Sequence, residues 1–215
     1  MKRWWILIVL LAVPLAGVHA ADAGKAHPHR GVLKPYPQPP APTRLTPADQ
    51  QKLSQGDPVY KTTDGETGGR GVAVFRVNAP PDVVWRTIND FRMYPQWIDE
   101  VTTCEVYGKS GNQIFVRFVL KSMGVEIEYF IAHDYRAADT WGTWTLDYSR
   151  ESDLSDSVGS WLVTEVSPGV SQAEYSVDLK VSGWVPGFIR KVIVDSGLEG
   201  ATQWLKREAE KRAAR

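Results

Sequence analysis

This 215-residue sequence has only one cysteine, no formal net charge and no recognisable catalytic motif. Its one cysteine, Cys104, rules out an intramolecular disulfide, so an ordinary hydrophobic core must hold the fold together. The 25 basic and 25 acidic side chains balance, and no overall positive field argues for a nucleic-acid partner. The sequence contains neither an H-E-x-x-H metal motif nor a glycine-rich phosphate loop, so we expect no metal ion and no other cofactor.

The first 20 residues are typical of a signal peptide. Two basic residues, Lys2 and Arg3, precede an apolar stretch at 6–18, and small residues ending at Ala20 form a cleavage site. The apolar stretch is shorter than the roughly 20 residues that span a bilayer, which favours export over an uncleaved N-terminal anchor. We therefore expect an exported, periplasmic protein, with the uncleaved anchor as the alternative.

Proline separates the next segment from the folded part of the chain. Residues 21–47 hold seven of the 14 prolines, a density that disfavours helix and central strand and favours an extended linker. Its two histidines, His27 and His29, have no further ligands nearby and are expected to lie in solvent. Residues 48–68 should form a short helix and a lead-in, and residues 69–215 are long enough for one domain with its own core.

Short runs of alternating apolar and polar residues fill most of the predicted domain. A first strand at 71–79 is followed by two short helical segments, one containing Trp85 and one containing Trp97. Six further runs have strand character: 101–107, 113–121, 125–134, 140–149, 157–166 and 172–181. Their short connections favour antiparallel neighbours in one sheet.

A long helix is predicted at 186–212. Apolar residues such as Leu198 and Leu205 recur there at helical spacing, and charged residues take the other side. Strands alone would leave one apolar face of their sheet uncovered, so this helix is expected to cover it, which gives an α+β fold. Gly197 lies inside the periodic stretch. It either causes a tolerated kink or, having no side chain, lets a ligand approach the helix closely.

Alternation along the strands also predicts which side chains face the helix. The apolar faces are longer than one helix can cover, which favours a strongly curved sheet around a cavity; a fully packed core is the alternative. Charged residues such as Arg117, Asp134 and Asp147 fall on the opposite face and should form a solvated cross-strand charge network. The candidate ligand-binding residues are Phe118, Tyr129, Ile131, Trp144, Leu146, Trp161 and Tyr175 on the strands, and Phe188, Val192 and Gly197 on the helix.

Several short segments resemble one protein family. They are 77–85, 89–91, 94–97, 156–161 and 185–188. The first three are similar to the opening of START-like (SRPBCC, helix-grip) domains, a superfamily that includes the polyketide cyclase/dehydrase and coenzyme Q-binding branches. The last two resemble parts of its polyketide cyclase-like members, and the resemblance covers about 69–212. It implies a curved seven-stranded antiparallel sheet wrapped around the long C-terminal helix, a short helix pair after the first strand, and a hydrophobic pocket inside.

The residues favour a carrier over a catalyst. His133 is the only histidine inside the predicted domain, and alternation places it on the inner face, yet no nucleophile or second histidine accompanies it. A lipid tail gains about 0.8 kcal/mol for each methylene removed from water, which favours its binding in a protein pocket. We therefore predict an exported binding protein that holds a hydrophobic small molecule, expected to be a membrane lipid, between the sheet and the last helix. Trp97, Trp184 and Phe188 are candidates for an entrance that contacts a membrane.

Two alternatives remain open at this point. The first is an aromatase/cyclase-like enzyme with His133 as base and Tyr129 or Tyr148 as hydrogen-bond donor. The second is a pocketless module that docks a partner through its proline-rich arm.

Overall fold

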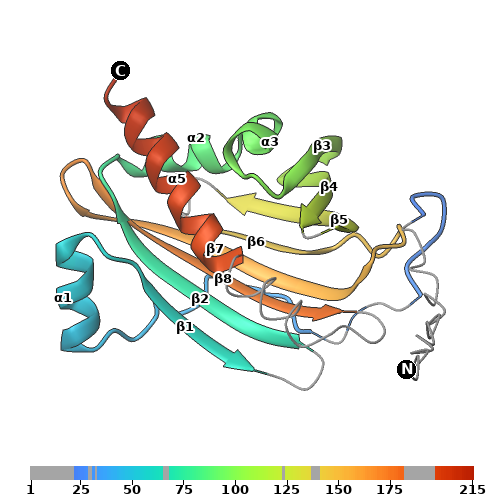
Figure 1. Ribbon diagram of the computed structural model, residues 1–215, viewed down its shortest axis with the longest axis horizontal. Helices are drawn as coiled ribbons and strands as arrows, with labels where there is room; N and C mark the ends of the chain where they lie inside the picture. The colour runs from blue at the N-terminus through green and yellow to red at the C-terminus, as the bar shows by residue number, and fades with distance from the viewer. Residues whose placement is uncertain are drawn as a thin grey trace, which may run out of the picture.

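A computed structural model of the protein describes residues 22–28, 31, 33–64, 68–122, 124–136, 141–181 and 197–215. Within them, eight antiparallel strands form one sheet in the order β1-β2-β8-β7-β6-β5-β4-β3 (Figure 1). The strands are β1 (Val59–Asp64), β2 (Gly68–Val77), β3 (Val101–Ser110), β4 (Gln113–Ser122), β5 (Val125–Arg136), β6 (Trp141–Leu146), β7 (Leu154–Ser167) and β8 (Val170–Val181). The helices are α1 (Pro47–Gln55), α2 (Pro81–Ile88), the 3-10 helix η1 (Phe91–Met93), α3 (Tyr94–Trp97) and α5 (Gly197–Ala213). The predicted α+β class is confirmed; the predicted signal peptide and the predicted helical residues 186–196 lie outside the described part of the chain.

The sheet has one strand more than the seven predicted. The additional strand, β1, pairs antiparallel with β2, so that Val59 lies opposite Val74 and Asp64 opposite Gly69. The predicted count is wrong because β1 packs against a small second apolar cluster, which local alternation did not reveal. There Val59 and Val74 pack with Leu53 of α1, on the face of β2 turned away from the main core.

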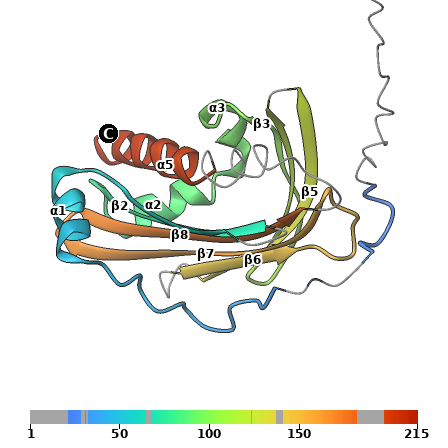
Figure 2. The same cartoon turned by 60° about the horizontal axis from the view of Figure 1, so that its bottom comes forward.

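The sheet curves around the helices that lie on one of its faces. Figure 2 shows β3, β4 and β5 rising from the plane of β7 and β8, with α2, α3 and α5 inside the curve. Register shifts interrupt β3 between Val101 and Thr103 and β7 between Leu154 and Asp156, and bulges of this kind bend a strand. The predicted curved sheet around the C-terminal helix is therefore confirmed, and its helix-covered face is called the inner face below.

The helix α5 packs on the inner face through an apolar stripe. Leu198, Trp204, Leu205 and Ala209 are buried and belong to the same core as the strand residues. Leu198 lies directly on the backbone of β2, because a Cβ added to Gly71 would meet its side chain. A glycine in β2 thus lets the helix approach the sheet closely.

The described residues of the proline-rich stretch, 22–28, 31 and 33–46, are called the N-terminal arm below and run along the sheet face opposite α2, α3 and α5 (Figure 2). The Leu33 backbone N–H donates to Oδ2 of Asp156 at 2.7 Å, and the Thr43 N–H donates to Oε2 of Glu174 at 2.8 Å. Asp156 is fully buried and Glu174 is 7 % exposed, so the arm covers carboxylates on the outer face of β7 and β8. The arm is therefore packed against the sheet through these two hydrogen bonds.

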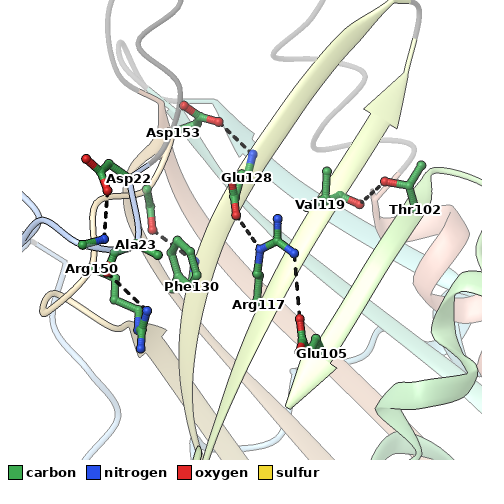
Figure 3. Close-up of polar contacts among 12 residues, drawn as sticks. Asp22, Ala23, Thr102, Glu105, Arg117, Val119, Glu128, Phe130, Arg150 and Asp153 are labelled. Atoms are coloured by element: carbon green, nitrogen blue, oxygen red, sulfur yellow. Dashed lines mark hydrogen bonds and ion pairs between the residues drawn. The ribbon is translucent and has the colours of Figure 1, made fainter. Parts of the chain in front are cut away.

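The expectation that His27 lies in solvent is wrong. Its ring packs edge-on against Tyr148 at 5.8 Å between centroids and is buried. Its Nε2 donates to the Leu154 carbonyl oxygen at 2.8 Å. Close by, the Arg150 guanidinium donates to the Ala23 carbonyl oxygen at 3.2 Å (Figure 3). These contacts fasten the start of the arm to the loop between β6 and β7.

The outer face of β3, β4 and β5 carries predicted ion pairs. Arg117 lies between two carboxylates, with Nε 2.5 Å from Oε1 of Glu128 and Nη1 3.8 Å from Oε2 of Glu105 (Figure 3). Asp147 accepts a hydrogen bond from the Tyr107 hydroxyl at 2.6 Å. The predicted cross-strand network is thus confirmed for Arg117, and it lies on the side of the sheet away from the helices.

Candidate functional site

Aromatic rings from five strands and η1 meet on the inner face. We call this set the aromatic cluster: Phe91, Phe118, Tyr129, His133, Tyr135, Trp144, Trp161 and Tyr175. Side chains two residues apart point to the same face of a strand, which brings three members from β5 to one side. The strand register then places Phe118 opposite Tyr129 and Trp161 opposite Tyr175.

The rings of the aromatic cluster contact one another in a continuous series. Tyr175 lies between Trp161 and Trp144, with distances between ring centroids of 4.6 and 5.5 Å. His133 lies 6.0 Å from Trp144 and 6.3 Å from Phe118. Such distances are those of favourable aromatic pairs, so the cluster is a packed and geometrically specific surface.

Two glycines allow these rings to lie close to the sheet. A Cβ added to Gly159 would fall on the ring of Trp144, its partner in the β6–β7 register. A Cβ added to Gly142 would fall on the ring of Tyr135. Glycine is needed at both positions because any side chain there would displace a ring of the cluster.

His133 is enclosed by rings and has no hydrogen-bond partner among the described residues. Its side chain is 6 % exposed, and neither Nδ1 nor Nε2 has a partner. The rings of Tyr135 and Phe91 lie 4.9 and 5.1 Å from it between centroids. Burial lowers the pKa of His133 from 6.5 to about 3, because a charged imidazole would lose its hydration there. At neutral pH the ring is therefore uncharged and only weakly basic, which disfavours it as a general base.

Three tyrosine hydroxyls of the cluster also have no hydrogen-bond partner in the described part of the chain: those of Tyr129, Tyr135 and Tyr175. By contrast, the neighbouring Tyr94 on α3 donates to the Ile88 carbonyl oxygen at 2.6 Å. Burial raises the pKa of all three hydroxyls, and the proximity of Tyr175 raises the pKa of the other two further. The three hydroxyls are therefore uncharged at neutral pH, and Tyr175 is near enough to influence the other two.

The helices α3 and α5 meet beside the cluster. Trp204 of α5 stacks on Trp97 of α3 at 5.6 Å between centroids, and the Arg212 guanidinium lies 4.9 Å from the same Trp97 ring. Trp97, predicted as part of an entrance, thus contacts two residues of α5. The other two predicted entrance residues, Trp184 and Phe188, lie outside the described residues.

The structure brings the strand residues of the predicted ligand-binding set together on the inner face. Of this set, Phe118, Ile131, Trp144, Leu146 and Trp161 are buried there, and Tyr129 and Tyr175 are half-buried. Gly197 is the first residue of α5, and Phe188 and Val192 lie outside the described residues. Contact of these residues with a ligand stays a prediction.

Sequence reasoning missed Tyr135 as a member of the cluster. The strand β5 continues two residues beyond its predicted end, and the alternation through Ile131 and His133 continues with it to Tyr135. Tyr148, predicted as a hydrogen-bond donor beside His133, donates instead to Oδ1 of Asp156 at 2.5 Å. The pair of His133 and Tyr148 required by one form of the enzyme hypothesis is therefore not formed.

Metal ligands and reactive thiols do not gather at this site. The described residues contain no group of three His, Cys, Asp or Glu side chains that could hold a metal ion. Burial raises the pKa of the Cys104 thiol, which therefore stays protonated. In the same part of the chain, no helix is both long and apolar enough to cross a bilayer.

Comparison with known proteins gives one family match. The family model described as "Polyketide cyclase / dehydrase and lipid transport" matches residues 69–213. A search of curated protein sequences finds no match.

Solved structures share the fold at low sequence identity. A STAR-related lipid transfer protein from Xanthomonas axonopodis has a TM-score of 0.58 at 13% identity, covering 71% of this chain and 93% of that one. The Zhui aromatase/cyclase from Streptomyces sp. R1128 has a TM-score of 0.59 at 15% identity, covering 72% of this chain and 96% of that one. A START superfamily protein from Mycobacterium smegmatis has a TM-score of 0.55 at 20% identity, covering 72% and 98%. At these identities the similarity concerns the fold alone.

Proposed function

Because the chain belongs to the polyketide cyclase/dehydrase and lipid transport family, we propose that it binds a hydrophobic small molecule on the inner face of its sheet. In full, the proposal is an exported protein that holds a membrane lipid between the sheet and the C-terminal helix. The START-like fold supports a ligand-binding role, and the residues of the inner face support an apolar ligand.

The observation that supports this proposal most directly is that two tyrosine rings on the inner face remain accessible. Tyr129 and Tyr175 pack against the core, yet both are only half-buried, and their hydroxyls have no partner among the described residues. In a fully packed core, such rings would be enclosed by their neighbours and their hydroxyls would be hydrogen-bonded. The combination supports a ligand space beside these two rings.

The chemistry of the aromatic cluster suits an apolar ligand. Its titratable members are uncharged at neutral pH, because burial lowers the pKa of His133 and raises those of the tyrosines. Each methylene group that moves from water onto such a surface contributes about 0.8 kcal/mol, so a fatty-acyl tail contributes on the order of 10 kcal/mol. This gain is what a carrier needs to hold a lipid in an aqueous compartment.

The export part of the proposal is supported by the N-terminal sequence. Lys2, Arg3 and the apolar stretch at 6–18 are typical of a signal peptide, with cleavage expected before Ala21. An exported domain of this fold would work in a compartment where membrane lipids must cross water. The mass of the N-terminal peptide of the exported protein measures this part of the proposal directly.

Mass spectrometry of an organic extract of the protein, purified from a background with native-like membranes, tests the proposed ligand. We expect a stoichiometric lipid from the wild type and its loss from Tyr175→Glu, because a charge there would lie among uncharged rings. The matched control is Val166→Glu, which places the same charge at a position of β7 that is 41% exposed and should retain the lipid. An empty wild-type extract, or a folded Tyr175→Glu protein that retains the lipid, would contradict the proposal.

A further inference from the structure

The eight tyrosines of the chain divide into two groups by the partners of their hydroxyls. Five hydroxyls are paired, joining Tyr36 to Ser176, Tyr60 to Thr202, Tyr94 to Ile88, Tyr107 to Asp147 and Tyr148 to Asp156. The remaining three, on Tyr129, Tyr135 and Tyr175, have no partner among the described residues. All three belong to the aromatic cluster. Unlike the two His133 nitrogens, these hydroxyls are not among the fully buried unpaired atoms of the described residues, so they keep accessible surface and are open to a hydrogen-bonding partner.

The unused groups lie along the series of contacting rings that contains His133. Tyr135 contacts the His133 ring directly, at 4.9 Å between centroids. Tyr175 and Tyr129 are each separated from His133 by one ring of the cluster. Since both nitrogens of His133 are also without a partner in the described chain, four side chains with free hydrogen-bonding capacity share one region of the inner face. Tyr135 is 8 % exposed and His133 is 6 % exposed, whereas Tyr129 and Tyr175 are only half-buried.

This region is electrically neutral in the described part of the chain. The pKa values of the four groups are shifted by burial and by neighbouring tyrosine and cysteine side chains, and by no lysine, arginine, aspartate or glutamate. Arg117, for comparison, lies on the outer face and is already paired with Glu128. A charged head group placed among the four would lose its hydration without gaining a counter-charge. Among the described residues, none would compensate the charge of a carboxylate, phosphate or ammonium group at this place.

We propose that the bound ligand is an uncharged amphiphile whose oxygen atom accepts a hydrogen bond from one of the three unpaired hydroxyls, those of Tyr129, Tyr135 and Tyr175. This inference rests on the proposed function, because it assigns the head group of the same ligand. A carbonyl, ester or hydroxyl oxygen matches these donors, and the neutral imidazole of His133 offers one donor and one acceptor beside them. The apolar part of the ligand would lie along the remaining rings of the cluster.

Three matched probes test the head group with the delipidated wild-type protein at neutral pH: pentadecane, methyl tetradecanoate and the tetradecanoate anion. Each is supplied from a cyclodextrin complex, and its affinity is measured by displacement of an apolar fluorescent dye. We expect the ester to bind about tenfold more tightly than the alkane, which corresponds to one hydrogen bond, and more tightly than the anion. Equal affinities for ester and alkane, or tightest binding of the anion, would overturn the inference while leaving the carrier function intact.

Substitutions that remove only one hydroxyl locate the contact. Among Tyr129→Phe, Tyr135→Phe and Tyr175→Phe, the variant that removes the contacting hydroxyl should reduce the ratio of ester to alkane affinity severalfold. Tyr107→Phe is the control, because its hydroxyl is bound to Asp147 on the outer face and its removal should keep the wild-type ratio. A ratio that survives all of the inner-face variants, with Tyr129→Phe included, would overturn the assignment. Failure of every probe to bind, pentadecane included, would overturn the proposed function as well.

Discussion

Replacing His133 by leucine should remove much of the protein's sensitivity to mild acid. In the folded state the ring is uncharged because burial lowers its pKa to about 3, whereas in the unfolded chain the pKa returns to its ordinary value of 6.5. Between these pH values the unfolded chain binds one proton that the folded protein does not. The stability that depends on a neutral His133 is therefore complete above pH 6.5 and is lost as the pH falls toward 3.

The size of the effect follows from the width of this window. Each pH unit between the two pKa values lowers the free energy of unfolding by about 1.4 kcal/mol. Two units below 6.5, at about pH 4.5, the loss is about 3 kcal/mol, a large share of the about 5–15 kcal/mol that stabilises an ordinary domain. The rings around His133 add no opposing titration, because Phe91, Phe118 and Trp144 carry no ionisable group and the pKa of Tyr135 is raised.

Urea denaturation of the wild type and His133→Leu, at neutral pH and at about pH 4.5, measures this effect through tryptophan fluorescence. All other titrating groups are common to both proteins, so the difference between their free energies of unfolding should shift by about 3 kcal/mol in favour of the variant at the lower pH. Ile131→Leu, two residues away on the same face of β5, is the control whose difference from the wild type should not change with pH. Parallel pH curves for the wild type and His133→Leu would refute the reasoning.

Three further substitutions test how the arm, the cluster and the helix are packed. Asp156→Asn should lower the free energy of unfolding by about 3 kcal/mol and speed tryptic cleavage of the N-terminal arm. The reason is that the buried carboxylate accepts hydrogen bonds from the Leu33 N–H and other donors. An unchanged cleavage rate would mean that the arm does not depend on this contact. Gly159→Ala should cost about 2 kcal/mol in urea denaturation and change the near-ultraviolet circular dichroism, since its Cβ would fall on the Trp144 ring. Wild-type values would contradict this packing. A Cβ added at Gly200 of α5 would have no neighbouring atom within 4 Å, so Gly200→Ala should raise the free energy of unfolding by about 1 kcal/mol and raise the melting temperature. A lower melting temperature would show that this glycine is needed.

Local patterns were sufficient for the seven predicted strands, the inner face and the described part of the C-terminal helix. The period of two along β4, β5 and β8 assigns Phe118, Tyr129 and Tyr175 to one side, and the structure places them there. The helical spacing of Leu198 and Leu205 likewise predicts the stripe that α5 buries. These predictions hold because each depends on residues that are neighbours along one element, so the sequence of that element contains the necessary information.

Contacts between distant segments decided the rest. The prolines of the N-terminal arm predict an extended conformation, but Leu33 and Asp156 are 123 residues apart, and no local pattern indicates that they meet. The amino-acid sequence likewise places His133 on an inward-facing position without revealing whether its nitrogens find a partner. That outcome depends on rings brought together from η1, β4, β5 and β6, whose arrangement around His133 arises only from the curvature of the folded sheet. A side chain's direction is set by its own strand, whereas its burial, its hydrogen bonds and hence its pKa are set by everything that packs against it.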